Sequence, residues 1–191
     1  MNVLGGSLSE PKDVQGLAHF LEHVAFQGSQ NYPDEDEFGR FVKENGGRRN
    51  AATSNMATTY YFKLHPGKVV EGVERLVDMV AKPLLRQNSI AREIKAVISE
   101  WNKSKVSDYR RARQIFYSAS DPTHPLNSFT CGNFDTIFNN GSVAQVAQRL
   151  NDYHKTHYSA NLMSIAILTK STRIVINKVH WKNNRSKRFL T

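Results

Sequence analysis

Residues 17–26 read LAHFLEHVAF, and this stretch decides how the rest of the chain is interpreted. It is apolar throughout except for His19, Glu22 and His23, so the sequence predicts a largely buried helix. Residues four apart lie on one face of a helix, and both imidazoles can therefore reach one metal ion. Burial of polar groups without partners is costly, and a metal ion supplies a partner. The alternative, an amphipathic helix with incidental histidines, stays open on this pattern alone.

The motif also contains a residue suited to acid–base chemistry. A catalytic zinc ion takes three protein ligands and keeps a further position for water. A carboxylate beside that water can accept its proton, which yields a strong nucleophile near neutral pH. Glu22 precedes the second histidine directly and is the expected general base. Hydrolysis of an amide bond is the natural reaction of such a site.

The His-x-x-Glu-His pattern resembles the zinc motif of the inverzincin peptidases, and its surroundings resemble the insulysin, pitrilysin and nardilysin family. The resemblance covers residues 3–168. The matching stretches are GLAHFLEHVAFQGSQNYPDEDEF at 16–38, RRNAATS at 48–54, HPLNSFTCGN at 124–133 and YHKTHYSANLM at 153–163. These stretches do not separate the insulysin branch from the nardilysin branch.

The resemblance implies the remaining zinc ligand. In the family this ligand is a glutamate 77 residues after the second histidine, and here that position is Glu100. One zinc ion per chain is therefore expected, held by His19, His23 and Glu100. Glu93 matches an acidic residue that supports the site from outside the ligand set. Because Glu93 and Glu100 are seven residues apart, both project from one face of the same helix.

The resemblance also implies where a peptide substrate binds. Residues 50–53 match an edge strand that pairs with the substrate backbone, an arrangement that tolerates varied side chains. Asn50 and Ala51 are the expected substrate contacts, and Phe26 matches a position that lines the substrate pocket. Asn50 could instead be a turn residue after Gly46 and Gly47, and Phe26 could be a core residue.

The expected function is that of a zinc-dependent metalloendopeptidase acting on peptides. Members of the family are about five times longer, and two halves close around the substrate, with the second half supplying an Arg and a Tyr that stabilise the oxyanion. The alternative is therefore a catalytically impaired fragment that binds zinc and peptides and needs a missing second half. The implied partners are peptide substrates, and beyond them a complementary C-terminal half or further copies of this chain.

The order of predicted elements indicates an α+β fold in which helices cover an antiparallel-rich sheet. Residues 1–169 are expected to form a partial N-terminal peptidase domain that lacks the family's opening strand and later domains, followed by a divergent basic tail at 170–191. Helices are predicted at 17–26, 34–44, 66–81, 89–116 with a break near 104–107, and 142–157. Strands are predicted at 50–54, 58–64 and 161–169.

Composition narrows the remaining possibilities. Cys131 is the only cysteine among 191 residues, which excludes an internal disulfide and argues against a Cys-based zinc site; it is interpreted as a small buried residue. No apolar run of membrane-spanning length and no signal-peptide pattern occur, so a cytosolic protein without a membrane partner is expected.

The net charge is +9. Polyanion binding through residues 178–191 is a weaker hypothesis, and no specific nucleic-acid partner is expected.

Overall fold

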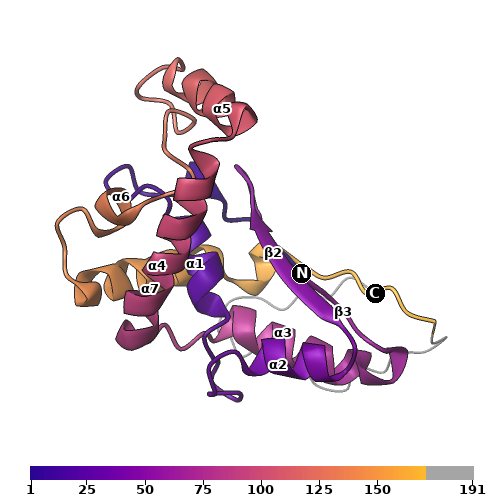
Figure 1. Cartoon of the computed structure of the whole chain (residues 1–191). Helices are drawn as coiled ribbons and strands as arrows, with labels where there is room; N and C mark the ends of the chain where they lie inside the picture. Colours follow the sequence, from indigo (N-terminus) through magenta and orange to yellow (C-terminus); the bar gives the residue numbers. More distant parts are fainter. Residues whose placement is uncertain (171–191) are drawn as a thin grey trace.

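The computed structural model describes residues 1–170, which form an antiparallel sheet with helices α1, α4 and α7 on one side (Figure 1). The sheet has four strands in the order β2-β3-β1-β4. Their bounds are Asn2–Val3 for β1, Arg48–Thr53 for β2, Thr58–Lys63 for β3 and Met163–Ser164 for β4. Alternate residues of β3 show which face is covered, because Tyr60 is buried whereas Tyr61 is exposed. The predicted α+β class is confirmed, and the predicted tail at 170–191 lies outside the described residues apart from Lys170.

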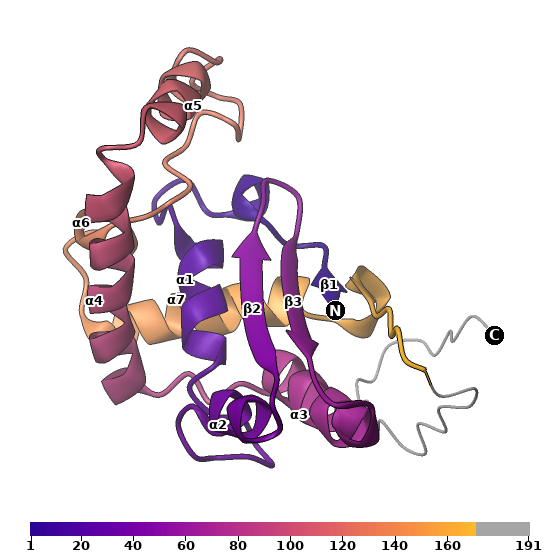
Figure 2. The same cartoon turned by 45° about the vertical axis from the view of Figure 1, so that its right-hand side comes forward.

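Seven α-helices lie within the described range of residues 1–170. They are α1 (Leu17–Ala25), α2 (Glu37–Glu44), α3 (Val69–Ala81), α4 (Gln87–Ser104), α5 (Asp108–Ser118), α6 (Phe134–Phe138) and α7 (Val143–His157). Figure 2 shows α1 between the sheet and α4, with α2 and α3 near one end of the strands and α5 near the other. In residues 1–170, none of the helices combines the length and apolar character needed to cross a bilayer.

Helix α1 forms the centre of the packed core. Its side chains Leu17, Phe20, Leu21 and Val24 are fully buried, and they follow the three-and-four spacing of one helix face. The helix contacts both β2 and α4. The half-buried residues His19 and His23 are therefore held on a rigid element whose opposite surfaces are fixed by packing.

The first turn of α1 is capped by a side chain from outside the helix. Gly16 occupies the N-cap position in a left-handed conformation and has no side chain to offer. The Glu10 carboxyl group takes over this task, since its Oε2 accepts from the Gly16 N–H at 2.7 Å and its Oε1 accepts from the Ala18 N–H at 2.8 Å. Burial raises the pKa of Glu10 to about 8, although these backbone hydrogen bonds oppose the shift.

The pKa of Glu10 predicts a pH dependence of stability. The unfolded chain releases this proton near 4.5, whereas the folded chain keeps it to about 8, so the free energy of unfolding should decrease as pH rises across that interval. Glu10→Gln should remove this decrease. It should also cost about 1–3 kcal/mol, because an amide NH₂ cannot accept from a backbone N–H. Urea unfolding of both proteins at pH 5 and pH 8 measures the two effects.

The matched control for this prediction is Glu74→Gln on the exposed surface of α3. It should keep both the stability and the pH dependence of the parent chain. Equal changes between pH 5 and pH 8 in the Glu10→Gln variant and the parent would show that Glu10 titrates normally in the folded protein.

Several predicted boundaries are confirmed. The predicted hairpin corresponds to β2 and β3, which pair in register from Arg48 with Lys63 to Thr53 with Thr58. The long helix breaks where it was expected to, because α4 ends at Ser104 and α5 begins at Asp108. The Ser107 side chain accepts from the Arg110 N–H and caps the new helix.

The predicted helix at 34–44 begins three residues later than expected, at Glu37. Asp36 has a left-handed backbone with a φ of 52°, which ends any helical path from Asp34. The acidic side chains before the helix form ion pairs, in which Asp34 meets Arg40, Glu35 meets Arg92 and Asp36 meets Arg49. Two of these pairs link the start of α2 to β2 and α4.

The predicted strand at 161–169 is wrong over most of its length. Residues Ala160–Leu162 form a 3₁₀ turn, and only Met163–Ser164 pair as a strand. Their partner is β1, where Val3 faces Met163 and Asn2 faces Ser164. This antiparallel pairing covers two residues of each strand, and residues 165–169 form no regular element.

Candidate metal centre

Helices α1 and α4 bring the three predicted ligands together. His19 Nε2 lies 3.3 Å from His23 Nε2 and 3.4 Å from Glu100 Oε2. His23 Nε2 lies 3.8 Å from Glu100 Oε1. In residues 1–170, these three side chains are the group of His, Cys, Asp and Glu residues placed to hold a metal ion. The two histidine side chains are 17% exposed and the Glu100 side chain is 46% exposed, so the site opens to solvent on the side of α4.

The spacing of these donor atoms suits zinc. Nitrogen and oxygen ligands lie about 2.0–2.2 Å from a tetrahedral zinc ion, which places neighbouring ligand atoms about 3.3–3.6 Å apart. The observed separations of 3.3, 3.4 and 3.8 Å nearly match those of such a set. Two imidazoles and one carboxylate also form a ligand combination common in catalytic zinc sites, with one position left for water or substrate.

Each histidine also lies near a protein oxygen through its second ring nitrogen. His19 Nδ1 lies 2.7 Å from the backbone carbonyl oxygen of Cys131. His23 Nδ1 lies 3.6 Å from Glu93 Oε2, and Gln27 Nε2 donates to Glu93 Oε1 at 2.9 Å. Such outer contacts fix the ring orientation of metal-binding histidines. Glu93, the carboxylate predicted to support the site, therefore lies beside His23.

The charges of the ligands are strongly coupled. Burial acts against the charged imidazolium of His23, but hydrogen bonding to Glu100 and Glu93 outweighs it and raises the pKa of His23 to about 9. The imidazoles of His19 and then of His23 lie against Glu100 and hold the pKa of that carboxyl group well below its usual range. Metal ions bind neutral imidazole, so a cation and a proton compete for His23.

Glu22 is positioned by the edge strand of the sheet. Thr53, the last residue of β2, donates from Oγ1 to Glu22 Oε2 at 2.6 Å. Behind it, Thr53 Oγ1 lies 3.2 Å from Thr58 Oγ1, and Thr58 donates to the carbonyl of Gly5 at 3.0 Å. The hydrogen bond from Thr53 therefore holds one carboxylate oxygen of Glu22. Glu22 comes three residues after His19 and so lies on the same face of α1.

The predicted substrate-contact residues lie on and beside β2, which is an edge strand among the described residues. Asn50 is exposed and donates to the Tyr61 hydroxyl at 3.3 Å, whereas Ala51 is buried on the helix-covered face. Phe26 packs against the Tyr60 ring, with centroids 5.9 Å apart, and the Arg49 guanidinium covers it at 4.1 Å. Asn50 is thus accessible, whereas Phe26 is already in contact with protein groups on both sides.

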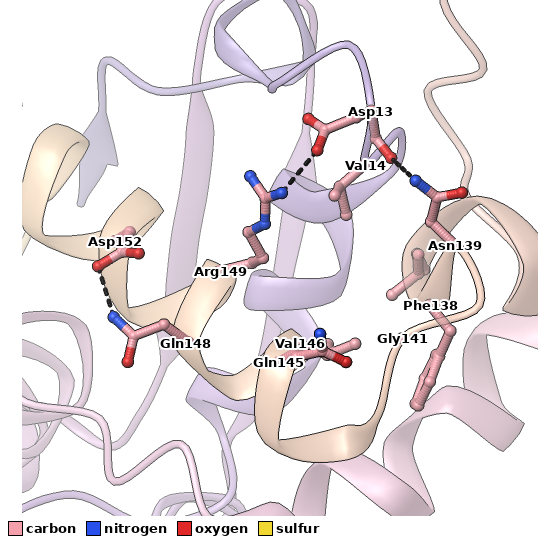
Figure 3. A pocket seen from close by; sticks show the side chains of 11 residues that line it. Asp13, Val14, Phe138, Asn139, Gly141, Gln145, Val146, Gln148, Arg149 and Asp152 are labelled. Atoms are coloured by element: carbon pink, nitrogen blue, oxygen red, sulfur yellow. Dashed lines mark hydrogen bonds and ion pairs between the residues drawn. The ribbon is translucent and has the colours of Figure 1, made fainter.

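A separate pocket of about 290 Å³ lies beside the start of α7, and none of the predicted site residues lines it. Figure 3 shows its polar groups bound to one another. Arg149 donates to Asp13 at 2.7 Å, and Gln148 donates to Asp152 at 2.9 Å. Because these polar groups are hydrogen-bonded to one another, the histidine cluster is the stronger candidate for a functional site.

Comparison with known proteins identifies the family. Residues 1–126 match the model of "Insulinase (Peptidase family M16)", which covers more than half of the chain. The chain belongs to the M16 peptidase family. This M16 assignment confirms the resemblance drawn from the HxxEH motif and its surroundings.

Relatives from plants, bacteria and mammals show similar identities. The chain is 38% identical over 174 residues to "Insulin-degrading enzyme-like 1, peroxisomal" of Arabidopsis thaliana, which covers 90% of this chain and 18% of that protein. It is 37% identical to Protease 3 of Escherichia coli K12, over 85% of this chain and 17% of that protein. It is 35% identical to nardilysin of Rattus norvegicus, over 91% of this chain and 15% of that protein.

A solved structure has the same fold. The crystal structure of pitrilysin superposes with a TM-score of 0.79 at 36% sequence identity, covering 84% of this chain and 17% of that chain. The M16 chain described here therefore spans less than a fifth of the length of these relatives.

Sequence analysis missed the groups that hold the site from outside. The Cys131 side chain was interpreted as a small buried residue, but it is half-buried, and its backbone carbonyl is the group that meets His19. Thr53 was included in the edge strand without a role, yet its hydroxyl contacts Glu22. Gly132, directly after Cys131, was the available signal, since a glycine there permits a close backbone approach.

Proposed function

We propose that this chain carries the active centre of a zinc metalloendopeptidase, with zinc held by His19, His23 and Glu100. The convergence of these three side chains from two helices carries the proposal. Their separations suit zinc, and membership of the M16 peptidase family supplies the reaction class. Glu93 supports His23 from the same helix that provides Glu100. A zinc ion bound at such a site lowers the pKa of a water molecule and polarises a carbonyl group.

Glu22 acts as the general base and then as the general acid. Its Oε2 is held by the Thr53 hydroxyl at 2.6 Å, which leaves Oε1 to accept a proton from the attacking water. The same atom returns the proton to the departing amine when the peptide bond breaks. A carboxylate that both accepts and returns a proton must stay within hydrogen-bond reach throughout, and the hydrogen bond from Thr53 helps to maintain that position.

The outer edge of β2, which no strand among residues 1–170 covers, holds the substrate peptide. An extended peptide added along this strand would run beside Asn50, Ala51 and Thr53, and main-chain hydrogen bonds would bind it whatever its side chains. Thr53 therefore links the peptide-binding strand directly to Glu22. Phe26 contributes to the adjoining wall from beneath the Arg49 guanidinium.

A second candidate function is zinc and peptide binding without turnover. It is favoured by the small share of the relatives that this chain spans, which is 15–18% of their length. Groups that stabilise the oxyanion would then have to come from outside these 191 residues. Loss of one such donor typically costs about 100-fold to 1,000-fold in rate.

Zinc content and peptide cleavage distinguish the two candidates. The experiment measures zinc stoichiometry on the purified chain and cleavage of a quenched fluorescent peptide, with and without a chelator. One zinc per chain with cleavage that the chelator abolishes supports the peptidase. One zinc without cleavage supports the binding fragment. Absence of zinc, or cleavage that is insensitive to the chelator, would contradict the proposed function.

A further inference from the structure

A short segment that the proposed mechanism does not use bridges the two metal-binding helices. We call residues 128–133, SFTCGN, the strap. The Phe129 ring packs edge-on against Trp101, with centroids 4.7 Å apart, directly beside Glu100 on α4. The Phe129 N–H donates to Gln15 Oε1 at 2.7 Å, just before α1. The strap is thus fixed to the chain on both sides of the metal centre.

The strap contacts His19 through a backbone carbonyl oxygen, which can only accept a hydrogen bond. The Cys131 carbonyl oxygen, 2.7 Å from His19 Nδ1, carries no proton and can only accept. His19 Nδ1 must therefore carry the hydrogen, and in the neutral imidazole the lone pair is then on Nε2. Nε2 is the atom that faces His23 and Glu100 at 3.3 and 3.4 Å. The contact thus selects the tautomer that a metal ion at this site requires.

Two glycines allow the strap to approach this closely. Gly16 and Gly132 have left-handed backbones, with φ of 89° and 73°. A Cβ on Gly16 would lie 2.2 Å from Gly132 Cα, and a Cβ on Gly132 would lie 2.9 Å from Gly16 Cα and 2.8 Å from Ile137 Cδ1. Either side chain would force the strap away from the start of α1. The position of the Cys131 carbonyl therefore depends on direct backbone contact between the two glycines.

We propose that the strap is a positioning element that sets the tautomer and ring orientation of His19 through the Cys131 carbonyl, with the contact between Gly16 and Gly132 as its anchor. The inference rests on the proposed function in one respect, namely that His19 Nε2 is a zinc ligand. The tautomer of His19 can be measured on the metal-free protein.

The test compares Gly132→Ala with Gly46→Ala. Gly46 also has a left-handed backbone, with φ of 67°, but a Cβ there meets nothing within 4 Å, so both variants share the same kind of backbone strain. Imidazole ¹⁵N NMR of the metal-free chain at pH 8 reads the tautomer of His19. Competition with a chromophoric chelator reads zinc affinity. Thermal unfolding reports whether each variant folds.

The parent chain and Gly46→Ala should show His19 protonated on Nδ1. Gly132→Ala should show a mixture of tautomers and a zinc affinity lower by about 10-fold to 100-fold, the usual effect of losing an outer contact to a metal-binding histidine. If Gly132→Ala does not fold, Phe129→Ala is measured instead, because it removes the Trp101 contact and leaves both glycines in place. It should change both readouts in the same direction.

The proposal is overturned if the folded strap variant keeps both the parent tautomer and the parent zinc affinity, or if His19 of the parent carries its proton on Nε2. Absence of zinc binding in the parent would remove the proposed function but not this inference, because the tautomer of His19 would still show whether the strap positions the ring. The two failures therefore remain distinguishable.

Discussion

Glu22→Gln is expected to lower the rate of peptide hydrolysis by at least about 100-fold, the usual range for loss of a general acid–base, while zinc content stays at one ion per chain. Glutamine has the shape of glutamate, and its carbonyl oxygen can still accept from the Thr53 hydroxyl that now lies 2.6 Å from Glu22. It cannot take up a proton from water near neutral pH. The loss should therefore appear in kcat at saturating peptide, with little change in KM.

Glu74→Gln on the exposed face of α3 is the matched control and should keep the parent rate. Zinc is measured on the same preparations, which separates loss of the base from loss of the metal. Normal cleavage by Glu22→Gln would refute the role of Glu22. Equal loss of zinc and activity would mean that Glu22 acts through the metal site and not as the proton carrier.

The histidine pair could be predicted from sequence because its geometry is local. A spacing of four residues in an apolar helix fixes the shared face before any tertiary structure is known, and α1 has the bounds that this spacing requires. The approach of Glu100 to the histidines cannot be predicted from local spacing. It followed only from resemblance to a family, and the structure brings it to 3.4 Å from His19 through the packing of α4 on α1.

The outer contacts of the site could not be predicted in the same way. A backbone carbonyl such as that of Cys131 exists at every position, so no residue type marks the one that meets His19. Thr53 faces Glu22 only because β2 packs against α1 in one register, and a shift of one residue would turn its hydroxyl to solvent.

His23→Ala is expected to lower zinc affinity by more than about 100-fold, since losing a ligand removes more than losing an outer contact, which itself costs about 10-fold to 100-fold. His23 lies between Glu93 and Glu100, at 3.6 and 3.8 Å. Its removal also leaves these two carboxylates without the imidazole that pairs with both. Chelator competition with the purified variant measures the affinity.

His65→Ala is the control for this prediction, because His65 is exposed and lies outside the metal-binding group; its Nδ1 accepts from the Gly67 N–H at 3.3 Å. It should bind zinc as the parent does. Unchanged affinity in His23→Ala would place the zinc elsewhere, and a shared loss in both variants would indicate dispersed binding by surface histidines. If only His23→Ala loses zinc affinity and Glu22→Gln keeps its zinc, the metal ligand and the general base are separate residues within one turn of α1. His23 and Glu22 are adjacent in sequence but contact different partners.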